Sequence, residues 1–158
     1  MQKQYDYIVI GAGSAGCAVA NRLSQDGLHT VALLEAGSRD LNPWIHVPVG
    51  YFKTMGNPAT DWCYKTQPST GLNGRSIPWP RGKVLGGSSS INGLLYVRGQ
   101  AQDFDDWANL GNEGWEWDNV LPYFKQSEDW HGKPSDLRGT GGPLAVSETR
   151  VSRPVIDA

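Results

Sequence analysis

The residues of this sequence best suited to chemistry form a glycine turn near its start, Gly11-x-Gly13-x-x-Gly16. Gly11 permits a tight turn, Gly13 lets the backbone approach a ligand, and Gly16 lets a helix pack closely on a strand. The helix after such a turn offers free N–H groups and the positive end of its dipole to phosphate oxygens. Glu35 lies 24 residues after Gly11, where a carboxylate accepts hydrogen bonds from a ribose diol. The pattern predicts a site for the pyrophosphate and adenosine ribose of a dinucleotide.

Two short apolar runs must position this turn. Residues 5–10 and 30–34 are rich in β-branched and aromatic side chains, which is typical of buried parallel strands. The apolar residues between them follow helical spacing, namely Ala15, Val19, Ala20 and Leu23. Strand, glycine turn, helix and strand make a βαβ unit of about 30 residues. This unit alone does not separate NAD from FAD, and a glycine turn in an unrelated α/β fold is the other interpretation.

A second glycine-rich segment covers residues 82–93. Its adjacent glycines allow backbone to approach a flat ligand or a phosphate, and its three serines and Asn92 add hydrogen-bonding groups. The sequence predicts a helix over 88–95. A simple NAD domain has no evident use for such a second cradle, so the segment favours FAD. The alternative is a Gly/Ser turn that only caps a helix.

The remaining pattern indicates an α/β chain with long loops. We expect a short helix at 49–55, short strands at 62–64 and 76–78, and helices at 102–110 and 118–128. The residues from 152 to 158 are typical of the first turn of another helix.

Composition excludes several classes of protein. The chain has 158 residues, 19% of them charged, and a net charge of −2, which is unlike a basic nucleic-acid-binding module. The sequence has no apolar run long enough for a transmembrane helix and no secretory h-region at its start. Its two cysteines, Cys17 and Cys63, are too few for a disulfide framework. We therefore expect a cytoplasmic protein, with peripheral membrane association left open.

Several further segments complete a family pattern. They are Gly82 to Gly99 with Asp105 beyond, Asp61-Trp62 with Tyr64 and Thr66, Asn73-Gly74-Arg75, and Trp117-Asp118-x-Val120-Leu121-Pro122-Tyr123-Phe124. With the βαβ fingerprint, they make the sequence resemble the glucose–methanol–choline oxidoreductase family, especially its choline-dehydrogenase-like and alcohol-dehydrogenase-like bacterial members. The resemblance covers nearly all of the chain.

The resemblance implies bound FAD and assigns residues to it. By position, the pyrophosphate would be held by Gly11, Gly13, Ser14, Ala15 and Gly16, and the adenosine ribose by Glu35 and Ala36. The flavin side would be lined by Arg81, Gly82, Val84, Leu85, Gly86, Gly87 and Ser88, and the isoalloxazine ring approached by Asn92, Gly93, Leu94 and Leu95. Ile91 stands where some members carry a His that links FAD covalently, so non-covalent FAD is expected.

The implied activity is oxidation of a primary alcohol, choline-like or aliphatic, by hydride transfer to flavin N5. Oxygen or a quinone would accept the electrons. The family's catalytic His lies near the C-terminus of a much longer chain, and His29, His46 and His131 do not align with it. We therefore expect no catalytic residue within these 158 residues, and no metal site.

The same reasoning predicts an incomplete FAD-binding domain. Residues 1–36 would form the βαβ unit, 37–100 a loop-rich flavin-covering region, and 101–158 helical segments leading toward an absent substrate domain. Only two parallel strands are evident, and the chain stops inside a predicted helix, so we expect the N-terminal part of a longer protein. The alternatives are a catalytically inactive truncated remnant and, less favoured, an NAD-binding oxidoreductase domain.

Overall fold

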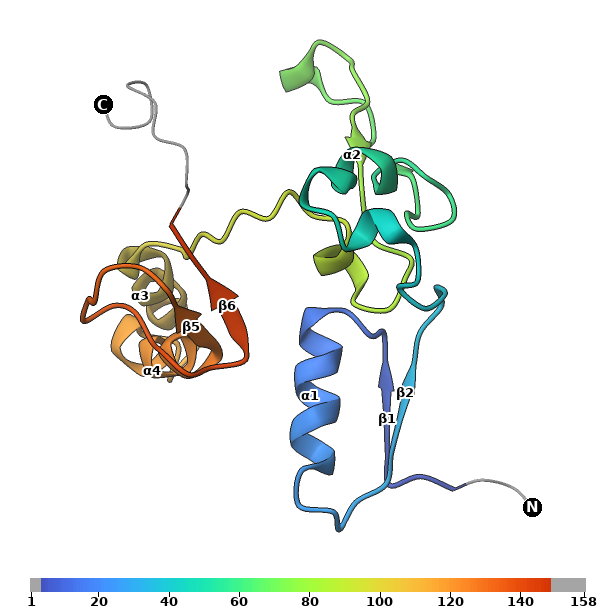
Figure 1. Cartoon of the computed structure of the whole chain (residues 1–158). Coiled ribbons are helices and arrows are strands. Elements are labelled where there is room, and N and C mark those ends of the chain that lie inside the picture. Colours follow the sequence, from blue (N-terminus) through green and yellow to red (C-terminus); the bar gives the residue numbers. More distant parts are fainter. Residues whose placement is uncertain (1–3, 149–158) are drawn as a thin grey trace. The chain divides into compact units, whose positions relative to one another are not determined.

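A computed structural model describes residues 4–148 of the chain. The chain forms two units, one up to Leu95 and one from Tyr96 onward (Figure 1). The helical turn expected at 152–158 lies outside the described residues. Within residues 4–148, no helix combines the length and apolar character needed to cross a bilayer.

The first unit begins with the expected βαβ arrangement. Strand β1 (Tyr7–Ile10), helix α1 (Ser14–Ser24) and strand β2 (Val31–Leu34) follow one another. The strands pair in parallel, with Tyr7 opposite Val31 and Ile10 opposite Leu34, and α1 packs along both of them (Figure 1). The helix ends before Gly27, whose φ of +70° suits a residue without Cβ. The prediction for this segment is confirmed.

The two-stranded sheet carries large apolar side chains that remain exposed. Ile8 is 63% exposed, Ile10 85% and Leu34 52%. The faces of a parallel sheet are usually both covered by other elements. These exposed side chains show that, within the described residues, the β1–β2 sheet is only partly covered.

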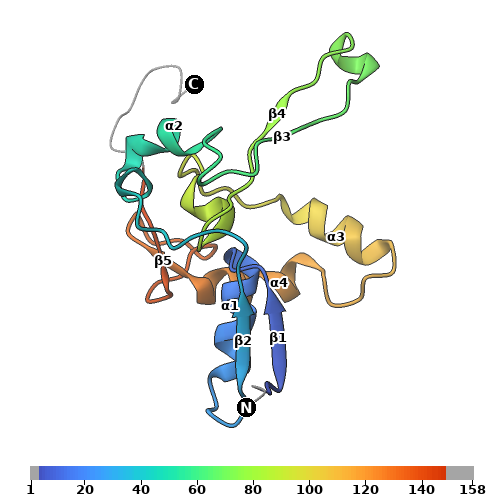
Figure 2. The ribbon, with the colours of Figure 1, turned by 90° about the vertical axis from the view of Figure 1, so that its right-hand side faces the viewer.

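Short elements make up the rest of the first unit. They are η1 (Pro43–Ile45), η2 (Pro48–Gly50), α2 (Tyr51–Thr54), β3 (Tyr64–Lys65), η3 (Thr70–Leu72), β4 (Pro78–Trp79) and η4 (Gly87–Ser90). Strands β3 and β4 lie side by side (Figure 2), and they pair antiparallel with Tyr64 opposite Trp79. The expected helix at 49–55 is present as η2 followed by α2. The expected strands at 62–64 and 76–78 are displaced by one or two residues.

The prediction of a helix over 88–95 is wrong. Only the 3-10 turn η4 forms, and Leu94 has a φ of +63°, outside the helical region. Instead of helical hydrogen bonds, backbone groups in this segment form hydrogen bonds with nearby side chains. The Ser90 hydroxyl donates to the Leu85 carbonyl at 2.7 Å, and the Asn92 side chain accepts the Leu94 N–H at 2.9 Å. Ser and Asn compete with helical hydrogen bonding in this way.

The second unit contains the two helices that periodicity predicts. Helix α3 (Ala101–Asn109) begins with a capping box formed by Gln100 and Asp103, and α4 (Trp117–Ser127) follows after a loop. The Asp105 carboxylate accepts the Trp117 N–H at 2.9 Å and so links the two helices. Phe104, which is buried, packs against an aromatic group made of Trp107, Trp117 and Phe124.

Two short strands close this unit and have no counterpart in the sequence predictions. Strand β5 (Glu128–Trp130) pairs in parallel with β6 (Leu144–Val146). Each strand has three residues, which is too short for an alternating pattern to stand out.

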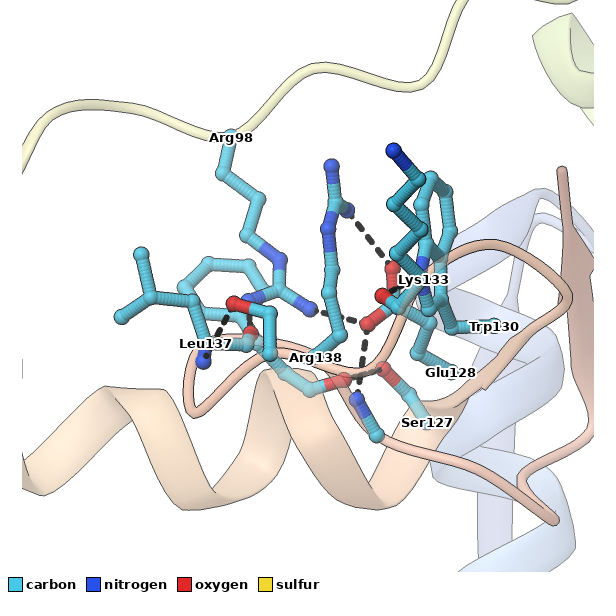
Figure 3. A network of polar contacts seen from close by, with 10 residues as sticks. Arg98, Ser127, Glu128, Trp130, Lys133, Leu137 and Arg138 are labelled. Carbon is cyan, nitrogen blue, oxygen red and sulfur yellow. Dashed lines mark hydrogen bonds and ion pairs between the residues drawn. The ribbon is translucent and has the colours of Figure 1, made fainter. Parts of the chain in front are cut away.

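A buried carboxylate, Glu128, connects several segments of the second unit by hydrogen bonds (Figure 3). It accepts hydrogen bonds from the guanidinium groups of Arg98 at 2.6 Å and Arg138 at 2.8 Å, and from the Gly139 N–H at 3.0 Å. Arg98 also donates to the Leu137 carbonyl. Burial raises the pKa of Glu128, but the Gly139 N–H and the Arg138 guanidinium outweigh it and hold the pKa below its ordinary value.

We predict that Glu128→Gln destabilises the protein by about 3 kcal/mol near neutral pH, because both guanidinium groups lose their counter-charge. A depressed native-state pKa means that the stabilisation is complete above the unfolded-state pKa and disappears as pH falls through the native-state pKa. Urea unfolding between about pH 7 and pH 3 should therefore be less pH-dependent in the variant. Glu113→Gln, at an exposed loop carboxylate, is the control. An unchanged pH dependence in Glu128→Gln would contradict this role.

Candidate cofactor-binding site

An open pocket of about 630 Å³ lies in the first unit, where the carboxyl ends of β1 and β2 meet the second glycine-rich segment. It is lined by Ile10, Gly11, Gly13, Leu34, Glu35, Ala36, Trp62, Tyr64, Arg81, Gly82, Gly87 and Ser88. Ligands of open α/β sheets bind outside the carboxyl ends of the strands. The pocket therefore lies where the βαβ unit predicts a ligand.

The first glycine turn is built by backbone contacts. Gly11 has a φ of +92° and donates its N–H to the Leu34 carbonyl at 2.7 Å, which ties the turn to the end of β2. A Cβ at Gly16 would collide with the Gly11 carbonyl, so the helix and the turn touch directly. No side chain caps the start of α1 and its first turn carries no acidic residue. Such a helix start suits an anionic ligand.

Glu35 is held in place by the backbone around it. Its two carboxylate oxygens accept the N–H groups of Ala12 and Gly37, each at 2.8 Å. The side chain thus joins the first glycine turn to the segment after β2. A carboxylate has further lone pairs, and since Glu35 lines the pocket it can accept hydrogen bonds from a bound diol.

The second glycine-rich segment lies directly against the first turn. Gly86 donates its N–H to the Ala12 carbonyl at 2.8 Å, and a parallel bridge pairs Gly13 with Gly86. A Cβ at Gly87 would stand 2.8 Å from the Gly13 Cα, which is closer than side-chain carbons come. Glycine at 87 is therefore needed to bring together two segments more than 70 residues apart in sequence.

A third contact joins the same two parts of the chain. Leu85 donates its N–H to the Ser38 carbonyl at 2.9 Å. A Cβ at Gly37 would collide with the backbone of Lys83 and Val84. The segment after β2 thus packs on residues 83–85 without side chains between them.

The other wall of the pocket is aromatic and cationic. The rings of Trp62 and Tyr64 stack with centroids 5.8 Å apart and planes within 6°. The Lys83 ammonium lies 4.8 Å from the Trp62 ring centroid, and the Arg81 guanidinium lies 5.0 Å from that of Trp79. These cations place positive charge beside the pocket, which suits an anionic ligand.

The structure gathers part of the predicted set. Eight predicted residues line the pocket, namely Gly11, Gly13, Glu35, Ala36, Arg81, Gly82, Gly87 and Ser88. Six further predicted residues are close in sequence to the lining residues but do not line the pocket, namely Ser14, Ala15, Gly16, Val84, Leu85 and Gly86. Val84 is fully buried.

The last predicted group lies elsewhere. Asn92 and Leu94 line a separate cavity of about 30 Å³, together with Trp44 and Tyr51. Leu95 is largely exposed, and Gly93 has no neighbour near its Cβ position. The structure does not bring residues 92–95 into the pocket.

Four lining residues lie outside the predicted set, namely Ile10, Leu34, Trp62 and Tyr64. The first two end the parallel strands, and their position could have been read from the sheet rule alone. The stacked pair of Trp62 and Tyr64 does not follow strand alternation, because β3 begins at Tyr64 and Cys63 between the two residues has a φ of +54°. Its position beside the glycine turns depends on the β3–β4 pairing.

The three histidines are placed outside this pocket. His29 lies 3.2 Å from the Asp26 carboxylate, and His46 bonds the Asp40 carbonyl at 2.6 Å. His131, in the second unit, lies 3.0 Å from the Asp129 carboxylate. Each has a local partner within its own loop or strand.

A parallel βαβ unit with a glycine turn, an acid after its second strand and a pocket at the strand ends defines a dinucleotide-binding α/β domain. Comparison with known proteins narrows this class. The chain belongs to the GMC oxidoreductase family, whose model matches residues 5–156. The resemblance inferred from the motifs is thereby confirmed.

Named relatives agree with this membership. The chain is 49% identical over 155 residues to an oxygen-dependent choline dehydrogenase of Rhizobium rhizogenes, covering 98% of this chain and 28% of that protein. It is 49% identical over 146 residues to that of Vibrio vulnificus, covering 92% of this chain and 26% of the relative. The chain thus spans about 28% of the length of the curated relatives.

Solved structures show the same fold. Pyridoxine 4-oxidase from Mesorbium loti superposes with a TM-score of 0.83 at 38% identity, over 90% of this chain and 28% of that one. Formate oxidase of Aspergillus oryzae gives 0.82 at 34% identity, over 94% and 27%. Each superposition covers just over a quarter of the solved chain, and the formate oxidase is a protein that carries FAD. The predicted α/β fold class is confirmed.

We predict that Gly37→Ala destabilises the protein by about 1–3 kcal/mol, because its Cβ would displace backbone that cannot rotate away. Chemical denaturation measures the change. Gly71→Ala is the matched control, since its Cβ would have only the Ser69 hydroxyl at 3.8 Å. Equal stability of the two variants would show that residues 83–84 do not pack against Gly37.

Proposed function

We propose that this chain forms the FAD-binding part of an oxidoreductase that oxidises a primary alcohol by hydride transfer to flavin. The observation that carries the proposal is the direct backbone contact between the two glycine-rich segments beside the pocket. A simple NAD fingerprint does not require the second segment. The names of the relatives, oxygen-dependent choline dehydrogenases, support a choline-like or aliphatic alcohol.

The residues present fit such a cofactor. The Cβ position of Gly13 has only the Gly87 Cα within 4 Å, at 3.9 Å, so the backbone there is open to a close ligand. We assign the pyrophosphate to the uncapped start of α1 and to the turn before it, through Gly11, Gly13, Ser14, Ala15 and Gly16. Glu35 and Ala36 would bind the adenosine ribose.

The second segment would serve the flavin half. Its assigned residues are Arg81, Gly82, Val84, Leu85, Gly86, Gly87 and Ser88. Asn92, Gly93, Leu94 and Leu95 lie outside the pocket and are assigned to the ring only by their position in the family pattern. The cofactor when bound supplies the hydride acceptor. The chain's own part is to bind and orient it, and backbone N–H groups near a flavin favour its reduced, anionic form.

We propose that FAD is held without a covalent bond. Ile91 is the residue at the position of the family's linking His, and it is buried and has no nucleophilic atom. Heat or acid precipitation of the complete protein should release all of its flavin into the supernatant. Flavin that stays in the pellet would contradict this.

The remaining assignments follow from family membership and composition. We propose a small-molecule alcohol as substrate, oxygen or a quinone as electron acceptor, a cytoplasmic location, and no nucleic-acid partner. The cysteines Cys17 and Cys63 are free, which agrees with a reducing compartment. We assign no catalytic base within the described residues, so the 158-residue chain by itself would turn over no alcohol.

The substitution Gly13→Ala tests the assignment of the pyrophosphate to the first glycine turn. The added methyl group meets no protein atom closer than 3.9 Å, so folding should be unchanged. It would occupy the space where a phosphate approaches the backbone. We expect the dissociation constant for FAD to rise at least about tenfold (~1.4 kcal/mol), measured by flavin fluorescence on the complete protein. Full FAD occupancy with wild-type affinity would contradict the assignment.

A further inference from the structure

Asp61 is a buried carboxylate that the proposed cofactor contacts do not use. Only 2% of it is exposed. Its two oxygens accept three backbone N–H groups, from Gly56 at 2.7 Å, Cys63 at 2.9 Å and Arg81 at 2.9 Å. Two of these donors lie in its own loop, whereas Arg81 is 20 residues further along the chain.

The Arg81 bond belongs to a short antiparallel clamp. Asp61 and Gly82 form an isolated bridge, and Trp62 donates its N–H to the Arg81 carbonyl at 2.9 Å. Lys83 donates its N–H to the Thr60 carbonyl at 2.8 Å. The carboxylate thus adds a hydrogen bond to the two segments at the point where the second glycine-rich segment begins.

Backbone contacts lead from this clamp to the first glycine turn. Gly82 donates its N–H to the Ser88 hydroxyl at 3.1 Å, and a Cβ at Gly82 would collide with the Gly87 carbonyl. Gly87 in turn packs against Gly13. From Asp61 to Gly13, no flexible side chain separates the contacting segments except the short Ser88 hydroxyl.

The charge of Asp61 suits this role. Burial raises the pKa of the carboxyl, but the N–H groups of Gly56, Arg81 and Cys63 outweigh it and hold the pKa below its ordinary value. The group is therefore ionised near neutral pH. A hydrogen bond to an ionised acceptor is about twice as strong as a neutral one.

We propose that Asp61 is a positioning residue for the candidate cofactor site. Through the Arg81 N–H, it sets the register of residues 81–83 and so places Gly82 and Gly87 at the distance from Gly13 that the cofactor needs. This inference rests on the proposed function. It adds to that function a residue outside the pocket whose loss weakens the binding of FAD.

Three variants separate positioning from general stability. Asp61→Ser keeps a hydroxyl that can accept the Cys63 N–H in a local turn but is too short to reach Arg81. Asp61→Asn can keep its amide oxygen on Cys63 and Arg81, whereas its NH2 group faces the Gly56 N–H and cannot accept that hydrogen bond. Thr60→Val is the control, because it removes the buried hydroxyl bond to the Thr54 carbonyl at 2.8 Å and leaves the Arg81 bond intact.

The complete protein is used for two measurements, the dissociation constant for FAD and hydrogen exchange at the Arg81 amide. We expect Asp61→Ser to weaken FAD binding at least about tenfold, and Asp61→Asn and Thr60→Val to weaken it less than about threefold. Arg81 protection should fall only in Asp61→Ser. Affinity that instead follows the unfolding stability of all three variants would overturn the positioning role.

A further measurement needs no variant. The inference expects the Arg81 amide of the wild-type protein to be protected before FAD is added, and an unprotected amide in that state would overturn it even if Asp61→Ser does not fold. Wild-type protein that fails to bind FAD would contradict the proposed function. Wild-type protein that binds FAD, with Asp61→Ser binding it equally well, would contradict only the role of Asp61.

Discussion

The candidate site depends on one close approach of bare backbone, between Ala12-Gly13 and Gly86-Gly87. One hydrogen bond and one glycine–glycine contact join the turn after β1 to a segment more than 70 residues away. A side chain at Gly87 would separate the two segments, because its Cβ would stand 2.8 Å from the Gly13 Cα, and the pocket between the strand ends, Arg81 and Ser88 would lose its shape. Glu35 and Asp61 each reinforce one side of this contact by accepting backbone N–H groups.

Features that depend on residues close together in the sequence could be predicted, whereas features that depend on distant residues could not. The βαβ unit depends on local patterns, namely apolar runs, helical spacing and glycines with defined roles, and its strands were predicted to within two residues. The prediction of a helix over 88–95 failed because Ser90 and Asn92 form hydrogen bonds with nearby backbone groups. The roles of Asp61 and Glu128 depend on partners 20 and 30 residues away, so each looks like an ordinary acid in sequence.

The two buried carboxylates, Glu128 and Asp61, are stabilised by different kinds of hydrogen-bond donor. Glu128 accepts hydrogen bonds from two guanidinium groups and one backbone N–H, whereas Asp61 accepts hydrogen bonds from three backbone N–H groups. The first arrangement fastens loops around a helix end, where long side chains can span the gaps. The second fastens backbone to backbone at short range, which suits a segment whose glycines leave no side chains to pack.

The exposed strands of the first unit have a consequence for handling the chain by itself. A two-stranded sheet has two free edges, and Ile8, Ile10 and Leu34 place apolar side chains along β1 and β2. A free edge with apolar neighbours is a template on which a strand of another molecule can pair. The 158-residue chain in isolation would therefore be prone to self-association through β1 and β2, and charged residues introduced along these strands would be the rational way to keep it monomeric.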